Sequence, residues 1–394
     1  MWPQEFQRER YFREQGSTVG EGVIGDFGSL KQFRTEDPDV QRFLIRAYQY
    51  VIARFDCDGF RIDTLRYLQG DLPRLFGNAM REFALSIGKK NFFTFGEVFD
   101  GRAEQDIALF IGRNTQSPGD GSIVGVDAAL DYPLFNVAKA VLKGFSAPQA
   151  LVDMYQFRKQ VEQNVVSSHG EATRFFVTFL DNHDNKERFY HVDPANPRAL
   201  DDQVTAAFAC LYSLQGIPCL YYGTEQQLHG AGSDELVREA LWGKVPAFDR
   251  TNPFFVALRA VAQARASQPA LRYGRQYFRP ISGDGRTFGI STMAPGVVSF
   301  SRILNDEEVV VAVNVADSPV EAFVIVDSTL NPAGSVFQIV YTNEASAAPP
   351  DAVATLGAGG TLTIHEVDGS TTDGPVSALR VRLGRRGAQI LARR

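Results

Sequence analysis

Hydrophobic residues recur every three or four positions along residues 35–58, which predicts a helix. The apolar positions are Val40, Leu44, Ala47, Val51 and Phe55. Asp37 can cap this helix, and Pro38 suits its first turn. The sequence DCDG then ends the helix, and FRID follows it as a short strand. The pattern therefore begins with one helix that leads into one strand.

The same alternation continues to about residue 270. Helical segments are predicted at 72–87, between 132 and 166, and at 198–214 and 252–266, while strands end near residues 63, 97, 127, 181 and 222. Strands that alternate with helices indicate a parallel sheet. Their apolar runs are nearly unbroken, so we expect both faces of these strands to be buried.

From about residue 272 the pattern changes to short strands separated by Gly, Pro, Asp and Asn. Examples are RQYFRPI, VVSFSRI, EEVVVAVNV and SVFQIVYT. This texture is typical of an all-β sandwich or barrel. The chain is thus expected to combine an α/β domain with an all-β domain.

Composition narrows the class of protein. The 394 residues carry a net charge of −6 and no Lys/Arg block, which argues against a nucleic-acid partner. The three cysteines, Cys57, Cys210 and Cys219, form neither a metal motif nor a disulfide framework, so a reducing compartment fits best. No apolar run is long enough for a membrane span, and the first residues are too polar for a signal peptide. A cytoplasmic location is therefore expected.

Three predicted strands end in acidic residues. Asp63 follows the first strand, Glu97 ends the second in FGEVF, and Asp184 follows the third in FLDNHD. Isolated acids after strands are usually caps. In a parallel α/β barrel, however, the carboxyl ends of the strands form one rim, where active sites lie. We therefore expect these acids to converge.

Converging carboxylates suit glycoside hydrolysis, in which one acid protonates the leaving oxygen and a second attacks the sugar or activates water. Arg61 lies on the same face of the strand as Asp63 and would favour its ionised form, as a nucleophile requires. Glu97 has apolar neighbours, which would raise its pKa, as a general acid requires. A lone Arg-x-Asp is more often a structural ion pair, so this assignment depends on the other motifs.

Several motifs together resemble the α-amylase family of retaining glycoside hydrolases. DGFRIDTLRYL, FTFGEVF and FVTFLDNHD resemble, in this order, its second, third and fourth signature regions. GIPCLYYGTEQ resembles the segment that ends its eighth barrel strand, and GDFGSLKQF the stretch that leaves its protruding B domain. The resemblance covers about residues 20–245, and the all-β domain fits the C domain of that family.

The resemblance implies a role for each matching residue. Asp63 matches the nucleophile, Glu97 the acid/base, and Asp184 the third acid, which stabilises the transition state. Arg61 matches the arginine beside the nucleophile, and His183 the histidine that binds the sugar at the cleavage point. The alternative for His183 is a structural histidine.

The neighbouring positions depart from the family pattern. Arg66 and Tyr67 replace a frequent Lys-His pair, which contacts the sugar beyond the cleavage point and, through a backbone carbonyl, a calcium ion. Arg66 retains the positive charge of the lysine. Tyr67 retains the backbone carbonyl but lacks the imidazole of the histidine. Aromatic residues that could stack on sugars, although such residues are more often core, are Tyr132, Phe27, Phe99 and Tyr222.

The first family signature, Asp-x-x-x-Asn-His, is absent, and only strands four to eight of a (β/α)8 TIM-type barrel can be identified. The residues before Gly25 are too few for three βα units of about 30 residues each. We therefore expect a remnant of domain B at 1–34, an incomplete barrel at 35–270 and a β-sandwich at 271–394. Its unpaired edges would favour self-association, and loss of the signature argues against a structural calcium ion.

The predicted function is retaining cleavage of α-1,4 bonds in starch-like glucans, impaired by the missing strands and requiring no cofactor. Within the same chemistry, the alternatives are an α-glucosidase, a glucanotransferase and a trehalose-forming isomerase. In another class, the alternative is a non-catalytic glucan-binding or accessory protein. The partner in each reading is an α-glucan or oligosaccharide, with neither nucleic acid nor membrane.

Overall fold

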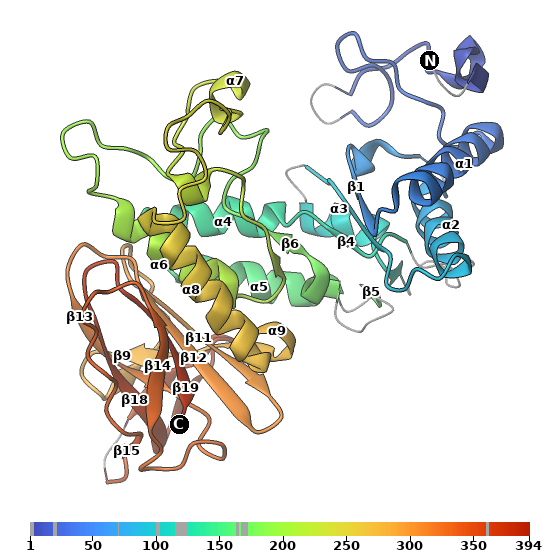
Figure 1. Ribbon diagram of the computed structural model, residues 1–394. Helices are drawn as coiled ribbons and strands as arrows, with labels where there is room; N and C mark the ends of the chain where they lie inside the picture. The colour runs from blue at the N-terminus through green and yellow to red at the C-terminus, as the bar shows by residue number, and fades with distance from the viewer. Residues whose placement is uncertain are drawn as a thin grey trace. The chain divides into compact units, whose positions relative to one another are not determined.

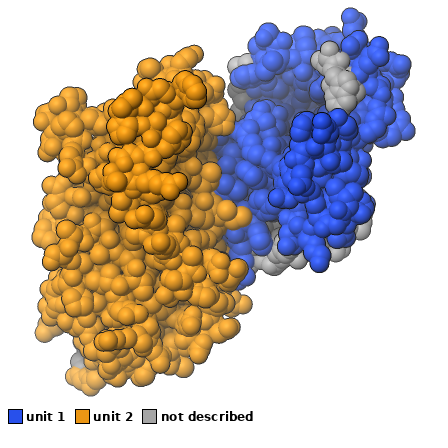
Figure 2. Space-filling view, viewed as in Figure 1, with its two compact units in different colours: residues 1–133, 157–177 blue, residues 134–156, 178–394 orange. Residues whose placement is uncertain are grey.

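The computed structural model describes residues 4–18, 22–69, 71–99, 103–114, 125–162, 165–166, 172–359 and 362–394. The chain forms two compact units, which Figure 2 colours separately. Unit 1 comprises residues 1–133 and 157–177, and unit 2 comprises residues 134–156 and 178–394. None of the helices within the described ranges combines the length and the apolar character needed to cross a bilayer.

Unit 1 contains a sheet of three short parallel strands. Their order is β1 (Gly59–Ile62), β2 (Phe93–Gly96) and β4 (Ala128–Ala129). Around them lie α1 (Pro38–Phe55), α2 (Leu72–Ser86), α3 (Ala103–Phe110) and the antiparallel pair of β3 (Arg113–Asn114) and β5 (Val165–Val166). Strands β1 and β2 are parallel and are connected through α2, which confirms the predicted α/β arrangement for this part of the chain. Of the strand predicted at 123–127, residues 123–124 lie outside the described residues.

Helix α1 begins and ends where its sequence provides caps. The Asp37 carboxylate accepts a hydrogen bond from the Asp39 N–H at 2.8 Å, and Pro38 occupies the first turn. Asp56 ends the helix in the left-handed conformation, at φ 57°. Helices α1 and α2 lie side by side (Figure 1), with Ile52 fully buried between them and the sheet. Phe55, which fits the predicted apolar stripe, is 68% exposed because it lies in the last turn.

Unit 2 begins with most of α4 (Tyr132–Leu142) and the first half of α5 (Gln149–Glu162). The short strand β6 (Val177–Thr178), within which the chain passes from unit 1 into unit 2, pairs with β7 (Ile217–Pro218). The remaining helices are α6 (Asp201–Ser213), α7 (Asp234–Val237), α8 (Pro253–Ser267) and α9 (Pro269–Tyr273). Short 3-10 helices occur in unit 1 at Gln4–Gln7, Glu9–Tyr11, Leu65–Tyr67 and Ala172–Phe175, and in unit 2 at Thr224–Gln226.

The all-β part of unit 2, as far as its residues are described, contains three sheets. One has the order β14-β19-β12-β11-β8, the second β15-β18-β13-β9 and the third β10-β16-β17. The strands are β8 (Arg275–Phe278), β9 (Ile281–Ser282), β10 (Thr287–Phe288), β11 (Val297–Leu304), β12 (Glu307–Asn314), β13 (Val320–Ile325), β14 (Phe337–Thr342), β15 (Ala354–Leu356), β16 (Thr363–His365), β17 (Thr371–Asp373), β18 (Val376–Leu383) and β19 (Ala388–Arg393).

Strand β12 explains why its sequence, EEVVVAVN, is almost continuously apolar. Alternate residues of a strand face opposite sides of its sheet. Val309, Val311 and Val313 join the cluster that contains the residues of α6 and α8, whereas Val310 and Ala312 join the cluster shared with β13 and β18. The five-stranded sheet is therefore covered by helices on one face and by the second sheet on the other (Figure 1).

Candidate functional site

Asp63 and Glu97 follow two neighbouring parallel strands. Strands β1 and β2 pair with Ile62 opposite Gly96, so each acid is the next residue beyond a paired position. The Glu97 N–H donates to the Ile62 carbonyl at 2.9 Å, which continues the ladder by one step. Because the carboxyl ends of parallel strands meet at one edge of a sheet, the fold places these two acids side by side.

Gly96 has a steric reason to precede Glu97. A Cβ atom at Gly96 would lie 2.3 Å from Cδ2 and 2.7 Å from Cβ of Leu65. Leu65 is fully buried in the short helix that follows Asp63, so it has little room to move away. The glycine therefore lets the segment after β1 pack directly against the end of β2.

Arg61 bridges the two acids. Its Nη1 donates to Asp63 Oδ1 at 2.6 Å, and its Nη2 lies 3.3 Å from Glu97 Oε2. The predicted pairing of Arg61 with Asp63 on one face of the strand is thus present. The same guanidinium also reaches Glu97, which the spacing of the sequence did not indicate.

The surroundings of the two carboxyl groups differ. The Asp63 side chain is 65% exposed, whereas that of Glu97 is 13% exposed. Burial, and then a hydrogen bond with Asp63, raise the pKa of Glu97 above its ordinary value. The Tyr132 hydroxyl, which donates to Glu97 Oε1 at 2.9 Å, and the charge of Arg61 oppose that rise. The balance of these effects favours the protonated form of Glu97.

Arg66 and Tyr67 lie in the short helix after Asp63. The Arg66 Nη1 donates to the Phe99 carbonyl at 3.3 Å, and its N–H donates to the Glu97 carbonyl at 3.3 Å. The Tyr67 carbonyl accepts a hydrogen bond from Gln32 Nε2 at 2.8 Å. These contacts fix the loop beside Glu97, while the sugar contacts assigned to Arg66 and Tyr67 stay a prediction.

The resemblance would make the Tyr67 carbonyl a calcium ligand, and this position can be tested against the structure. The Gln32 amide donates to both the Tyr67 and the Val23 carbonyls, and its oxygen accepts from the Gly25 N–H at 2.7 Å. The Tyr67 carbonyl therefore already accepts a hydrogen bond from a side chain. Within the described ranges, no group of three His, Cys, Asp or Glu residues could hold a metal ion. The doubt about a structural calcium ion stays a prediction.

His183 and Asp184 lie in unit 2, in the loop after β6. His183 Nε2 lies 3.0 Å from Asp184 Oδ2, and Arg238 Nη2 donates to Asp184 Oδ1 at 2.8 Å. The Asp184 N–H also donates to Asn182 Oδ1 at 2.9 Å. Asp184 is therefore held by a cation and by its own loop.

The structure thus brings the predicted residues together in two sets. Arg61, Asp63 and Glu97 form one set in unit 1, and His183 and Asp184 form the other in unit 2. That the two sets make a single site stays a prediction.

Two contributors were not predicted in these roles. Tyr132 was a candidate for stacking on sugar, with a core position as the more frequent alternative; it is 2% exposed, and its hydroxyl bonds to Glu97. Arg238 was not predicted at all, because it lies far from Asp184 in sequence and belongs to no motif. Phe99, Phe27 and Tyr222 are exposed, at 59%, 62% and 43%, so their stacking on sugars stays a prediction.

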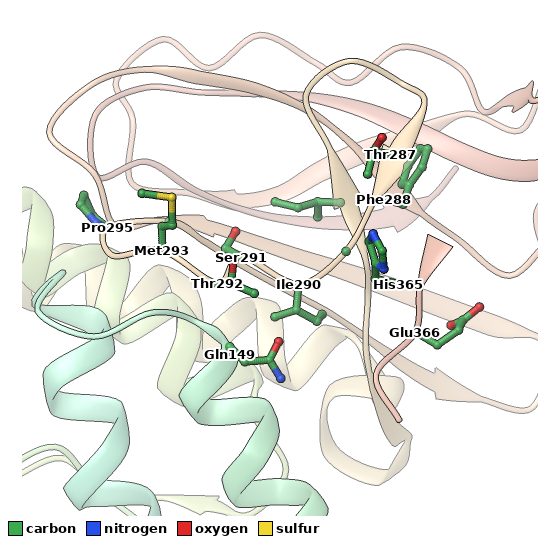
Figure 3. A pocket seen from close by; sticks show the side chains of 13 residues that line it. Gln149, Thr287, Phe288, Ile290, Ser291, Thr292, Met293, Pro295, His365 and Glu366 are labelled. Carbon is green, nitrogen blue, oxygen red and sulfur yellow. The ribbon is translucent and has the colours of Figure 1, made fainter. Parts of the chain in front are cut away.

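A separate cavity of about 450 Å³ lies in the β-rich part of unit 2. Gln149 at the start of α5 lies on one side, and His365 and Glu366 lie on another (Figure 3). Thr287 and Met293 also line it. None of its lining residues belongs to the acid sets.

The sequence matches the Alpha-amylase family, described as alpha amylase, catalytic domain, over residues 23–247. An alpha-amylase of Streptomyces lividans is 26% identical over 360 residues, covering 85% of this chain and 36% of that protein. A cyclomaltodextrin glucanotransferase of Bacillus licheniformis is 26% identical over 302 residues, covering 75% of this chain and 37% of that protein. The chain thus spans little more than a third of the length of these curated relatives.

Solved structures share the fold. An alpha-amylase from Geobacillus thermoleovorans, complexed with acarbose, gives a TM-score of 0.65 at 22% identity, covering 94% of this chain and 67% of that one. An Anoxybacillus alpha-amylase gives 0.66 at 19% identity, covering 98% and 70%. The family fold is a (β/α)8 barrel with a β-rich C-terminal domain, which confirms the predicted fold class. The absence of barrel strands one to three and the self-association of the chain stay predictions. Because the match spans more than half of the sequence, the chain belongs to the alpha-amylase family.

Proposed function

We propose that this chain cleaves α-1,4 bonds of starch-like glucans with retention of configuration, with Asp63 as the nucleophile and Glu97 as the acid/base. The observation that carries the proposal is the pair of neighbouring carboxyl groups at the ends of β1 and β2, which a single guanidinium, that of Arg61, contacts at 2.6 Å and 3.3 Å. A close pair is what a retaining mechanism requires, because an inverting enzyme leaves room for a water molecule between its two acids.

The different surroundings of the two acids suit two different roles. Burial favours the protonated form of Glu97, which can pass its proton to the glycosidic oxygen as the bond between that oxygen and the anomeric carbon breaks. Arg61 favours the ionised form of Asp63, which attacks the anomeric carbon and forms a glycosyl ester. Glu97, now a carboxylate, then takes a proton from water, whose oxygen attacks the same carbon and releases Asp63.

The remaining predicted residues are proposed to bind the sugar. Asp184 would accept hydrogen bonds from sugar hydroxyls and stabilise positive charge in the transition state, and His183 would contact the sugar at the cleavage point. Arg66 and Tyr67 would contact the sugar beyond it. Membership of the family and the match of the FLDNHD motif support these assignments.

Hydrolysis is proposed over transfer, and product analysis separates the two. The names of the relatives include both alpha-amylase and glucanotransferase, and the catalytic pair is compatible with either reaction. With maltoheptaose, hydrolysis gives shorter linear products, whereas transfer also gives longer or cyclic ones. With maltose, glucose as the sole product would indicate an α-glucosidase, and trehalose would indicate an isomerase. No change in either substrate would contradict the proposal and leave a binding role.

The role of Glu97 is tested with two substrates that differ in leaving group. A glucosyl fluoride needs no proton to leave, so Glu97→Gln should keep formation of the glycosyl ester from it while losing maltoheptaose cleavage. Asp63→Asn should lose both reactions. Glu344, whose pKa is also raised by burial, lies in the β-rich part of unit 2, so Glu344→Gln is a matched control that should keep both. Equal losses on both substrates for Glu97→Gln, in the first turnover, would contradict the assigned role.

A further inference from the structure

Arg188 is a buried cation that the proposed chemistry does not use. It lies four residues after Asp184, and its side chain is 0% exposed. Arginine is almost never fully buried unless its charge is compensated by partners. The partners of Arg188 therefore indicate what this buried charge does in the protein.

The guanidinium of Arg188 joins two ends of one loop. Its Nη1 donates to the Tyr222 carbonyl at 2.8 Å, just after β7, and its Nη2 donates to the Val237 carbonyl at 2.9 Å, at the end of α7. The guanidinium also lies over the Tyr221 ring, 4.4 Å from its centroid. Glu239 is the nearest acid, with its Oε1 3.7 Å from Arg188 Nε. The segment 222–237 is thus closed at its base by one side chain.

The residue after this clamp is the one that holds Asp184. Arg238 directly follows Val237, and its Nε donates to the His183 carbonyl at 2.9 Å while its Nη2 donates to Asp184 Oδ1 at 2.8 Å. The backbones of the two segments are also joined, because the Gly232 N–H donates to the Lys186 carbonyl at 2.7 Å. Arg188 therefore holds the segment 222–237, and Arg238, the residue after that segment, holds Asp184.

We propose that Arg188 is a positioning residue that fixes Arg238 and, through Arg238, the orientation of Asp184. The part that concerns turnover rests on the proposed function, in which Asp184 stabilises the transition state. The guanidinium of Arg188 donates to the carbonyls of Tyr222 and Val237, at the two ends of the segment that directly precedes Arg238. A displaced Asp184 loses stabilisation of the transition state more than binding of the substrate, so the effect falls on kcat rather than on KM.

Arg302 provides a matched control. It is 1% exposed and likewise donates to two carbonyls, those of Ser213 at 2.7 Å and Gly274 at 2.8 Å, in a different part of unit 2. Truncation of either arginine by methionine should lower the thermal midpoint, because each leaves two buried carbonyls unpaired. Only Arg188→Met should also lower kcat on maltoheptaose, by about 100-fold, the cost typical of a small misplacement at an active site.

Two further variants keep the test decisive if Arg188→Met does not fold. Arg188→Lys retains a donor for at least one carbonyl and should recover most of the lost kcat, whereas Arg238→Met, at a half-exposed position, should reproduce the loss. Since the two arginines act in series, the double variant Arg188→Met/Arg238→Met should be no worse than the worse single variant. Additive losses would overturn the proposal, as would equal losses of kcat in Arg188→Met and Arg302→Met, or an unchanged kcat in Arg238→Met.

Fluorescence of Trp242 tests the clamp without any glucan. The chain has two tryptophans, and Trp242 lies four residues after Arg238 with 90% of its surface exposed. In a Trp2→Phe background, Arg188→Met should lower the anisotropy of Trp242, Arg188→Lys should lower it less, and the Arg302 variants should not lower it. If the wild-type chain shows no turnover, the proposed function fails while this measurement still tests the clamp. Unchanged anisotropy in a folded Arg188→Met variant, or in a folded Arg238→Met variant if Arg188→Met does not fold, would overturn the proposal.

Discussion

The Tyr132→Phe variant tests how the surroundings of Glu97 set its protonation. Burial raises the pKa of Glu97, and the Tyr132 hydroxyl, at 2.9 Å from Oε1, is one of two groups that oppose the rise. The substitution removes this hydroxyl and keeps the ring. The charged form of Glu97 then loses a donor, so its pKa should rise further.

The size of the effect follows from the strength of the lost bond. A hydrogen bond to a charged group contributes about 1.5–3 kcal/mol, and one pKa unit corresponds to about 1.4 kcal/mol. Arg61 Nη2 remains 3.3 Å from Glu97, so the lower end of that range applies. The alkaline limb of kcat/KM, along which the general acid loses its proton, should therefore move to higher pH by about one unit.

The assay is kcat/KM on maltoheptaose as a function of pH. Tyr190→Phe is a matched control, because the Tyr190 hydroxyl also donates to a carboxylate, Asp201 Oδ1, at 2.9 Å, outside the acid sets. The control should leave the alkaline limb in place. An alkaline limb that stays fixed, or moves to lower pH, in Tyr132→Phe would refute the assignment of Glu97 as the general acid.

Three predictions concern stability. Arg158→Met should lower the free energy of unfolding of unit 1 by about 3–5 kcal/mol in urea denaturation, because it leaves the fully buried Asp131 carboxylate without its cation; a loss below about 1 kcal/mol would contradict this. Burial raises the pKa of Asp181, so the stability that this group contributes is complete below its unfolded pKa and is lost as pH rises through the folded pKa. Asp181→Asn should therefore flatten the fall in stability from acidic to neutral pH, and an unchanged slope would count against it. Asp37→Ala should cost about 1 kcal/mol by removing the cap on the Asp39 N–H, measured by the same denaturation, and a neutral result would show that water replaces the cap.

Much of the fold could be predicted because local signals and tertiary contacts agree. Asp37 and Pro38 mark the start of α1 both in the sequence and in the structure. The sequence EEVVVAVNV was predicted as a strand of an all-β domain, and β12 forms there, with its alternate residues in two different clusters. At Phe55 the helical period predicts burial, but the helix ends there, and the ring is exposed.

The sequence could predict which site residues meet only where those residues lie at the ends of parallel strands. Asp63 and Glu97 meet because they follow adjacent parallel strands, a placement that alternating strands and helices already imply. The roles of Arg238 and Arg188 could not be predicted, because their contacts join loops that are distant in sequence and have no periodic pattern. Tyr132 carried an aromatic signal but not its orientation, which depends on the packing of α4.

The central claim, that Asp63 is the nucleophile of a retaining reaction, is tested most directly by trapping the glycosyl enzyme. In Glu97→Gln, an α-maltosyl fluoride can form the ester, but water is no longer activated to release it, so the ester should accumulate. Mass spectrometry of the intact chain and of its peptides should then find one maltosyl group attached to Asp63. A maltosyl group on a different residue, or no adduct together with products of inverted configuration, would contradict the account.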